Sequence, residues 1–264
     1  MKRSILRYWR IGTTGLCFAT FMCVSLLLTL CVFPVVKFLP VSKFRKQRLI
    51  LLLIHWSFKL FMKYMQWLSP IEAFEVVGMC HLDPKETYIF IANHPTLIDI
   101  VAIMSCIPFC TCIVKKSLSQ HFSIRGVVRA AGYIVYDNSQ QLIEDCEKCF
   151  KKKRSLVVFP EGTRSPAYGL HPFSRGAAHI ALRTGVSVVP IVITYNNPTL
   201  LKGEPWFKIP ERPLHLKLQF HPPMAFPKEI QEENRLPIQV RALSRYFEDF
   251  FRQALGFDRD YREP

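Results

Sequence analysis

A histidine and an aspartate stand five positions apart in the run Ile91-Ala-Asn-His-Pro-Thr-Leu-Ile-Asp99 and form the first candidate pair for chemistry. On one continuous helix, at ~100° per residue, two side chains five apart would point about 140° away from each other. Pro95 disfavours helical backbone at His94 and is itself a favoured first helical residue, which predicts His94 in a turn and Asp99 one turn inside a helix. Because helical side chains lean toward the N-terminus, the carboxylate can reach back to the imidazole. The pair would then be a general base, with the carboxylate on one ring nitrogen and the other free to accept a proton.

The plain alternative for this run involves no chemistry. Asn93 or Thr96 would cap a helix, because Asn and Thr are favoured capping residues. His94 would then be an ordinary residue at the boundary between strand and helix. The run alone does not separate these two interpretations.

A second polar turn follows in Val157-Val-Phe-Pro-Glu-Gly-Thr-Arg-Ser165, where a proline and a glycine end a buried apolar strand and allow a tight turn. Such a turn suits phosphate or a polar lipid headgroup. Arg164 can donate two parallel hydrogen bonds to phosphate oxygens, and the loop amides and Thr163 can add more. The alternative is a rigid turn held by an ion pair between Glu161 and Arg164.

The N-terminal seventy residues are predicted to anchor the chain in a membrane. Residues 11–36 carry no charge, and as a helix they would extend about 39 Å, enough to cross a hydrocarbon core of ~30 Å. Basic residues flank this segment on both sides, so the positive-inside rule leaves its orientation open. Residues 49–60 form a second apolar stretch that reads as an interfacial helix or as the return arm of a hairpin. A single span and a hairpin dipping into one leaflet are both open.

Composition narrows the class of partner. The chain of 264 residues carries a formal net charge of +15, which favours anionic partners. No zinc-finger or aromatic-basic RNA-binding pattern accompanies this charge, so lipid is expected rather than nucleic acid. The nine cysteines lie mostly in apolar surroundings and are expected to be reduced. Cys146 and Cys149 have no second ligand pair at zinc spacing, so no metal site is predicted.

Residues 71–264 are predicted to form one domain of the α/β class, because short apolar runs alternate with helical ones. Functional groups are expected at its strand-to-helix turns. The expected strands are 74–79, 88–92, 111–114, 132–136, 156–159, 187–195 and 214–220. The expected helices are 95–106, 118–130, 140–152, 175–184 and 237–255.

With both turns in view, the sequence resembles the lysophospholipid acyltransferase family, whose bacterial representatives acylate 1-acyl-glycerol-3-phosphate. Four motifs in the family's order carry the resemblance: residues 93–99, 132–136, 159–165 and 188–191. The segment 172–186 and the run Lys115–Leu118 also look like parts of the family's sequence. The likeness covers about residues 74–193. It implies a mixed, mostly parallel sheet flanked by helices, preceded by a membrane helix or helical hairpin.

The resemblance also implies a reaction in lipid biosynthesis. His94 would deprotonate an acceptor hydroxyl while Asp99 orients the ring, and the alkoxide would attack an acyl thioester of coenzyme A or acyl carrier protein. This chemistry needs no metal and no bound cofactor. The resemblance further implies membrane lipid as a partner. With the reduced cysteines, it is expected that the protein lies on the inner (cytoplasmic) membrane with its catalytic domain facing the cytoplasm. Substrate-binding positions that the resemblance implies are Glu161, Gly162, Thr163, Arg164, Lys115, Asn138, Arg175 and Pro190.

Two departures from the family pattern bear on the acceptor. Asn138 stands where the family usually has an arginine, and Ser174 stands where it often has a lysine, with Arg175 one place later. An asparagine can hydrogen-bond a hydroxyl or phosphate but supplies no net charge. The alternatives are therefore an amino-acid lipid, glycolipid or polyketide-like acceptor. A membrane lipid-binding or scaffold protein that has lost catalysis is the other alternative.

Overall fold

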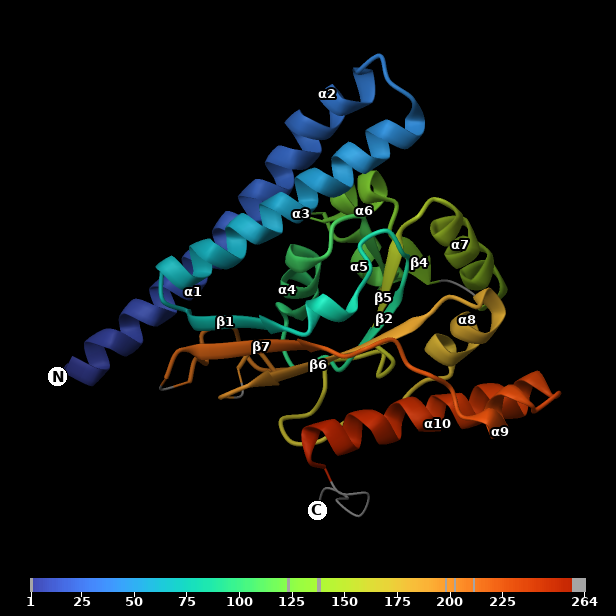
Figure 1. The fold of residues 1–264 in the computed structure, drawn as a ribbon. Coiled ribbons are helices and arrows are strands. Elements are labelled where there is room, and N and C mark those ends of the chain that lie inside the picture. The colour runs from blue at the N-terminus through green and yellow to red at the C-terminus, as the bar shows by residue number, and fades with distance from the viewer. Residues whose placement is uncertain are drawn as a thin grey trace.

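A long helical hairpin leads into a sheet covered by helices in the computed structural model, which describes residues 2–122, 124–136, 139–197, 199–201, 203–210 and 212–257 (Figure 1). The first arm is one continuous rod made of α1 (Lys2–Leu27), a π-helical turn η1 (Leu28–Val32) and α2 (Phe33–Phe38). Pro34 does not end the helix. The Phe33 amide bonds to the Leu28 carbonyl five residues back, and the widened turn lets the rod continue past the proline.

The second arm, α3 (Lys43–Trp67), turns back along the first, so the two arms form a hairpin (Figure 1). Ser42 caps α3 through its hydroxyl, which accepts a hydrogen bond from the Arg45 amide. Within the described residues, one helical stretch, Arg7–Phe38, is long and apolar enough to cross a membrane. The structure thus has residues 43–67 as the return arm of a helical hairpin.

Seven strands form the sheet in the order β1-β7-β6-β2-β5-β3-β4. Every neighbouring pair is parallel except β6 with β7, which is antiparallel. The sheet is thus mixed and mostly parallel, which confirms the predicted fold class. The strands are β1 (Ile71–Val77), β2 (Ile89–Ala92), β3 (Cys110–Lys115), β4 (Ile134–Tyr136), β5 (Ser155–Val158), β6 (Val188–Tyr195) and β7 (Leu214–Phe220).

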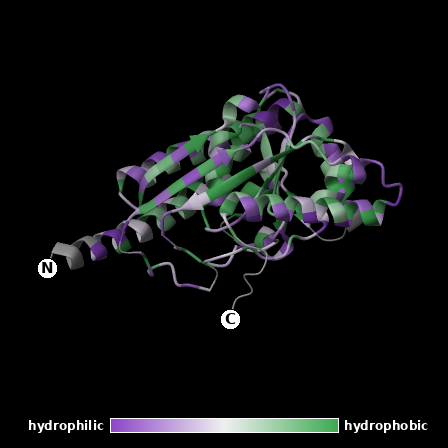
Figure 2. Cartoon of the chain, turned by 60° about the horizontal axis from the view of Figure 1, so that its bottom comes forward, coloured by the Kyte–Doolittle hydropathy of each residue, from purple (hydrophilic) through white to green (hydrophobic). Residues whose placement is uncertain are grey.

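Both faces of the sheet are covered by helices, because alternate residues of its central strands point to opposite sides. Phe90 of β2 packs in one buried cluster with Met62 of α3, while Ile89 and Ile91 pack in another with Phe247 of the C-terminal helix. The hydrophobic central strands are visible in Figure 2. The remaining helices are α4 (Asp99–Cys106), α5 (Lys116–Gln120), α6 (Arg125–Ala131), α7 (Ser139–Lys151), α8 (Gly176–Thr184), α9 (Lys228–Gln231) and α10 (Leu236–Leu255), with a 3-10 turn η2 (Met79–His81).

Two predicted helices differ from those observed. The expected helix 118–130 is two shorter ones, α5 and α6, separated by a turn around His121 and Phe122. The expected helix 95–106 begins only at Asp99, because side chains in residues 93–99 replace its first turn. The short helix α9 was not predicted.

Candidate active site

The two polar turns meet because their strands are neighbours. β2 and β5 run parallel, with Ile89 opposite Leu156 and Ile91 opposite Val158, so both strands end at the same edge of the sheet. The His94 amide donates to Ser165 Oγ at 3.1 Å, and the Ser165 amide donates to the His94 carbonyl at 2.7 Å. The second turn therefore fixes the backbone of the first.

His94 and Asp99 form the predicted pair. His94 Nδ1 lies 2.8 Å from Asp99 Oδ2, and the carboxylate is fully buried. The same carboxylate also accepts hydrogen bonds from the amide of Thr96, at 2.7 Å, and from its hydroxyl. Because the Asp99 side chain bonds to the Thr96 amide, residues 95–98 stay non-helical and α4 begins at Asp99. The prediction that Asp99 lies one turn inside the helix is therefore wrong.

The imidazole is held so that one nitrogen can accept a proton. Phe159 stacks on the His94 ring with centroids 4.2 Å apart and planes 20° from parallel. Nδ1 faces Asp99, so Nε2 is the nitrogen left to take a proton from a substrate. The side chain keeps 19% of its surface exposed, which leaves room for a hydroxyl to approach.

Neither capping alternative for the first turn describes the structure. The residue before α4 is Ile98, and no side chain caps the helix there. Asn93 instead extends the sheet, because its side-chain amide donates to the Ile193 carbonyl at 2.9 Å and its oxygen accepts from the Ile193 amide at 2.8 Å. This role of Asn93 in fixing the end of β2 against β6 was missed in the sequence.

Glu161 lies inside the protein and not opposite Arg164, so the predicted alternative of an ion pair between them is wrong. Its carboxylate accepts hydrogen bonds from the His94 amide at 3.1 Å, the Ser165 hydroxyl and the His171 amide at 2.9 Å. Burial raises the pKa of Glu161, and these three hydrogen bonds partly offset that rise. Both oxygens of Glu161 are therefore engaged in holding the turn of residues 94–99, called the catalytic turn below, and the contact of Glu161 with an acceptor stays a prediction.

The rest of the second turn is arranged as a tight bend. Gly162 has a left-handed backbone with φ +64°, and its amide donates to the Phe159 carbonyl at 3.0 Å, so that amide is not available to a phosphate. Thr163 is partly exposed beside it. The Arg164 guanidinium donates to the Leu200 carbonyl, on the long connection after β6.

The remaining predicted substrate positions are spread around the sheet edge. Lys115 is exposed at the end of β3, and Arg175 is exposed just before α8. Pro190 is buried in β6, opposite Ile91 of β2, and does not line either large cavity, so its assignment to a substrate pocket is not supported. Asn138 lies outside the described residues.

Tyr195 is a further group near the pair that the sequence did not indicate. It ends β6, and its hydroxyl donates to the Ala167 carbonyl at 3.1 Å. Burial raises the pKa of Tyr195, and the negative charge of Asp99 raises it further. A tyrosine at the end of an apolar strand carries no spacing signal that would have singled it out.

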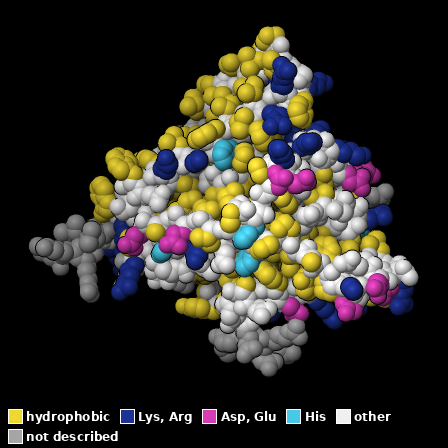
Figure 3. Space-filling view, in the orientation of Figure 1, with side chains coloured by type: hydrophobic (Ala, Val, Ile, Leu, Met, Phe, Trp, Pro, Cys, Tyr) yellow, Lys and Arg dark blue, Asp and Glu magenta, His cyan; other side chains and the backbone are white. Residues whose placement is uncertain are grey.

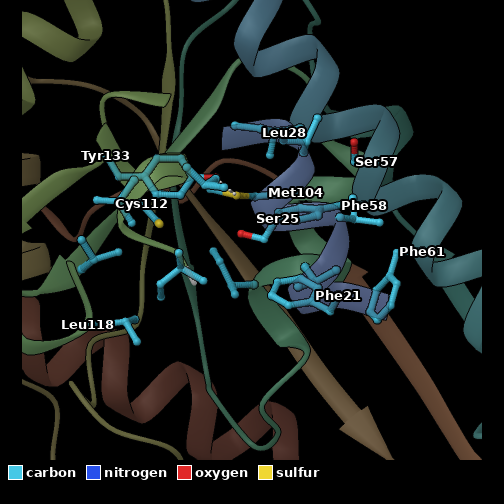
Figure 4. A pocket seen from close by; sticks show the side chains of 18 of the residues that line it. Phe21, Ser25, Leu28, Ser57, Phe58, Phe61, Met104, Cys112, Leu118 and Tyr133 are labelled. Atoms are coloured by element: carbon cyan, nitrogen blue, oxygen red, sulfur yellow. Dashed lines mark hydrogen bonds between the residues drawn. The ribbon is translucent and has the colours of Figure 1, made fainter. Parts of the chain in front are cut away.

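An apolar cavity of about 500 Å³ opens beside the histidine, and His94 and Phe159 are among its walls. It lies between the hairpin and the sheet. Phe21 and Phe61 stand at one end of the labelled group, with Cys112 and Tyr133 at the other (Figure 4). A cavity of this size and lining suits a hydrocarbon chain.

The described residues contain no group of three or more His, Cys, Asp or Glu that could hold a metal ion. Burial raises the pKa of the Cys146 thiol to about 12 and of the Cys149 thiol to about 11, so both are protonated at neutral pH. All nine cysteines are free thiols.

Comparison with known proteins identifies this part of the chain. Residues 73–194 match the family model described as Acyltransferase. The chain is 30% identical over 145 residues to the mouse 1-acyl-sn-glycerol-3-phosphate acyltransferase alpha, covering 52% of this chain and 51% of that protein. It is 37% identical over 136 residues to the Saccharomyces cerevisiae 1-acyl-sn-glycerol-3-phosphate acyltransferase, covering 48% and 44%. The chain thus spans about half the length of the curated relatives it matches.

The fold has a solved counterpart. The crystal structure of the 1-acyl-sn-glycerophosphate (LPA) acyltransferase from Thermotoga maritima superposes with a TM-score of 0.70, covering 97% of this chain and all of that one. Sequence identity is 20%, so the likeness establishes the arrangement of helices and strands. Because nearly the whole chain is covered, the likeness includes the helical hairpin as well as the sheet.

Proposed function

We propose that this chain is a member of the lysophospholipid acyltransferase family and that it transfers a fatty acyl group from an acyl thioester to the hydroxyl of a lysophospholipid. The acceptor that fits the named relatives is 1-acyl-glycerol-3-phosphate. Coenzyme A and acyl carrier protein both supply the required thioester. The single observation that carries the proposal is the His94 Nδ1 to Asp99 Oδ2 contact of 2.8 Å at the mouth of an apolar cavity.

The proposed reaction follows from that contact. Nε2 of His94 takes the proton of the acceptor hydroxyl, and Asp99 stabilises the imidazolium that forms. The alkoxide attacks the thioester carbonyl, a carbon–oxygen bond forms, and the carbon–sulfur bond breaks. The imidazolium then returns the proton to the departing thiolate, so no covalent acyl-enzyme arises and the protein ends unchanged.

The 500 Å³ cavity is the proposed site of the acyl chain that is transferred. Its apolar walls exclude water from the hydrocarbon, and His94 at its edge places the base beside the thioester. Chain binding and catalysis would therefore depend on the same contact between hairpin and sheet.

We further propose that the hairpin lies along the membrane surface. α3 packs along its length against α4, α6 and β1, so the hairpin cannot cross the bilayer without carrying the rest of the protein with it. Hydrophobic side chains cover the outer face of the hairpin, and Lys and Arg side chains gather beside it (Figure 3). An apolar face bordered by cations is typical of helices that lie in the interface.

The test is acyl transfer by the purified protein with labelled acyl thioesters and a panel of lysolipids. We expect wild-type protein to form a diacyl product and His94→Ala to form none, while both bind vesicles equally. His179→Ala, on α8 away from the cavity, is the matched control and should keep full activity. Wild-type turnover by His94→Ala would disprove the assignment of the base, and binding of lysolipid without transfer by the wild type would favour the scaffold alternative.

A further inference from the structure

A second apolar cavity, of about 560 Å³, lies beside the first and is separated from it by shared side chains. Phe21 and Phe61 of the hairpin and Ile100 and Val101 of α4 line both cavities. Leu97 and Ile98, which stand between His94 and Asp99 in the sequence, line the second cavity. Both cavities therefore border the catalytic turn, the first at His94 and the second at Leu97 and Ile98.

The outer wall of the second cavity belongs to the long connection between β6 and β7. Thr199, Leu200 and Ile209 of this connection face the cavity. Trp206 secures the connection on α1: its ring contacts Phe18 edge-on at 6.2 Å and lies so close to Gly15 that a Cβ there would come within 3.1 Å of it. The connection is thus packed on the hairpin and encloses the cavity from outside.

The same connection is tied to the second polar turn. Arg164 donates to the carbonyl of Leu200, whose residue lines the second cavity. The turn that fixes His94 therefore also fixes the outer wall of this cavity. A molecule in the second cavity would contact a surface already joined to the catalytic turn.

The two cavities differ in charge. Among the described residues that line the first, none is Lys, Arg, Asp or Glu. Arg10 and Arg212 line the second, in addition to its apolar walls. A hydrocarbon cavity bordered by cations complements a lipid whose negative charge lies close to its chain.

We propose that the second cavity binds the hydrocarbon chain of the acceptor lysolipid, with its anionic headgroup beside Arg10 and Arg212. This inference rests on the proposed function, because transfer between two lipids brings two hydrocarbon chains to one base. The donor chain is separated from the charges of its carrier by the long arm that ends in the thioester, so it fits the uncharged first cavity. The acceptor carries its headgroup within a few atoms of both its hydroxyl and its chain, so it fits the second.

Filling one cavity at a time tests the proposal. Cys17 lines the second cavity and Ser57 lines the first, so Cys17→Phe and Ser57→Phe are a matched pair on the two arms of the hairpin. Transfer is measured with acceptors of six to eighteen carbons at a fixed donor, and with donors of the same range at a fixed acceptor. Thr14→Phe is a second filler of the second cavity if Cys17→Phe does not fold.

We expect Cys17→Phe to lower kcat/KM at least tenfold for the eighteen-carbon acceptor. For the six-carbon acceptor, kcat/KM should stay within about twofold of the wild-type value. The dependence of transfer on the length of the donor chain should not change. Ser57→Phe should shift the donor profile and leave the acceptor profile unchanged. The proposal is overturned if Cys17→Phe and Thr14→Phe shift the donor profile, or if they lower transfer to short and long acceptors equally. If the wild type transfers to no lysolipid at all, the proposed function fails instead.

A binding measurement separates the second cavity from catalysis. His94→Ala protein in nanodiscs of neutral lipid is titrated with an eighteen-carbon lysophosphatidate analogue that lacks the acceptor hydroxyl. We expect saturable binding that Cys17→Phe weakens at least tenfold and that Arg212→Gln weakens several-fold. Arg183→Gln, at an exposed position of α8, is the charge-matched control and should bind as the parent does. Equal binding by all these variants would place the acceptor chain elsewhere.

Discussion

At the scale of single residues, the Asp99 carboxylate has two roles, and one substitution tests them while keeping the size of the side chain. It receives the His94 ring and also holds the Thr96 amide and hydroxyl. Asp99→Asn keeps the shape but presents an amide to these donors and removes the charge that stabilises an imidazolium. We expect kcat to fall on the order of 10²–10⁴-fold with little change in KM for the donor. Steady-state kinetics measures this, and an unchanged kcat would show that Asp99 only caps the turn.

Glu161 is predicted to position the base without touching substrate. The two carboxylate oxygens of Glu161 accept hydrogen bonds from three donors. In Glu161→Gln one of these oxygens becomes an NH2 group that faces a backbone amide, so two donors meet. We expect this to lower the free energy of unfolding by about 1–3 kcal/mol. The neutral amide also avoids the cost of burying a charged carboxylate, which is what raises the pKa of Glu161. We therefore expect Glu161→Gln to affect kcat more than the free energy of unfolding.

The measurement for Glu161→Gln is kcat beside the free energy of unfolding. We expect kcat to fall at least tenfold while KM for the acceptor stays within about threefold, because the variant displaces His94 and not the lipid. Glu248→Gln is the control: Glu248 also accepts from a backbone amide, that of Phe173, but lies on α10. A rise in KM for the acceptor with kcat unchanged would instead make Glu161 a substrate ligand.

The sequence predicts contacts between residues that lie close together in the chain, but not contacts between distant ones. The pairing of His94 with Asp99 was predictable because both lie in one short run whose proline limits the backbone. The role of Glu161 was not, because its partner His94 is 67 positions away and the contact exists only once β2 and β5 are paired. Contacts with distant residues also replace the ion pair between Glu161 and Arg164 that their spacing made plausible. Glu161 bonds to the His94 amide, and Arg164 bonds to the Leu200 carbonyl.

At the scale of elements, the strands were easier to predict than the starts of helices. The seven expected strands overlap the seven observed, because runs of buried apolar residues depend little on their surroundings. The helix after β2 was placed to begin at Pro95 from local preference alone. Side-chain hydrogen bonds between Thr96 and Asp99 shift its start to Asp99, and such bonds are visible only in three dimensions.

Two glycines in helices test the contact between hairpin and sheet. A Cβ on Gly126 of α6 would lie 2.0 Å from Thr29 of the π-helical turn, whereas a Cβ on Gly12 of α1 would meet nothing within 4 Å. We expect Gly126→Ala to lower the free energy of unfolding by about 1–3 kcal/mol, because α6 must move away from the hairpin. Gly12→Ala should be neutral or stabilising by up to ~1 kcal/mol. Denaturant unfolding compares them, and equal effects would contradict this close packing.

At the scale of the whole molecule, the hairpin forms part of the walls of both cavities of the proposed active site. Phe21 and Phe61 come from its two arms and separate the two cavities. His94 lines the first cavity, and the connection that Arg164 holds forms part of the wall of the second. A hairpin that rests on lipid would therefore deliver chains from the membrane into a site that the same helices complete.

The outer face of the hairpin should bind lipid independently of catalysis. Trp56 and Trp67 of α3 are 60% and 78% exposed and line neither cavity, and each large apolar side chain that enters the interface contributes about 1.5–3 kcal/mol. Trp56→Glu with Trp67→Glu should lower binding to vesicles of anionic lipid at least tenfold in a flotation assay. Ile238→Glu, also exposed but on α10 across the sheet, should bind as the wild type does. The double variant should retain transfer to lysolipid dispersed in detergent, because neither residue touches His94 or the catalytic turn. Equal loss of binding in all variants would mean that the whole surface, and not the hairpin, contacts the membrane.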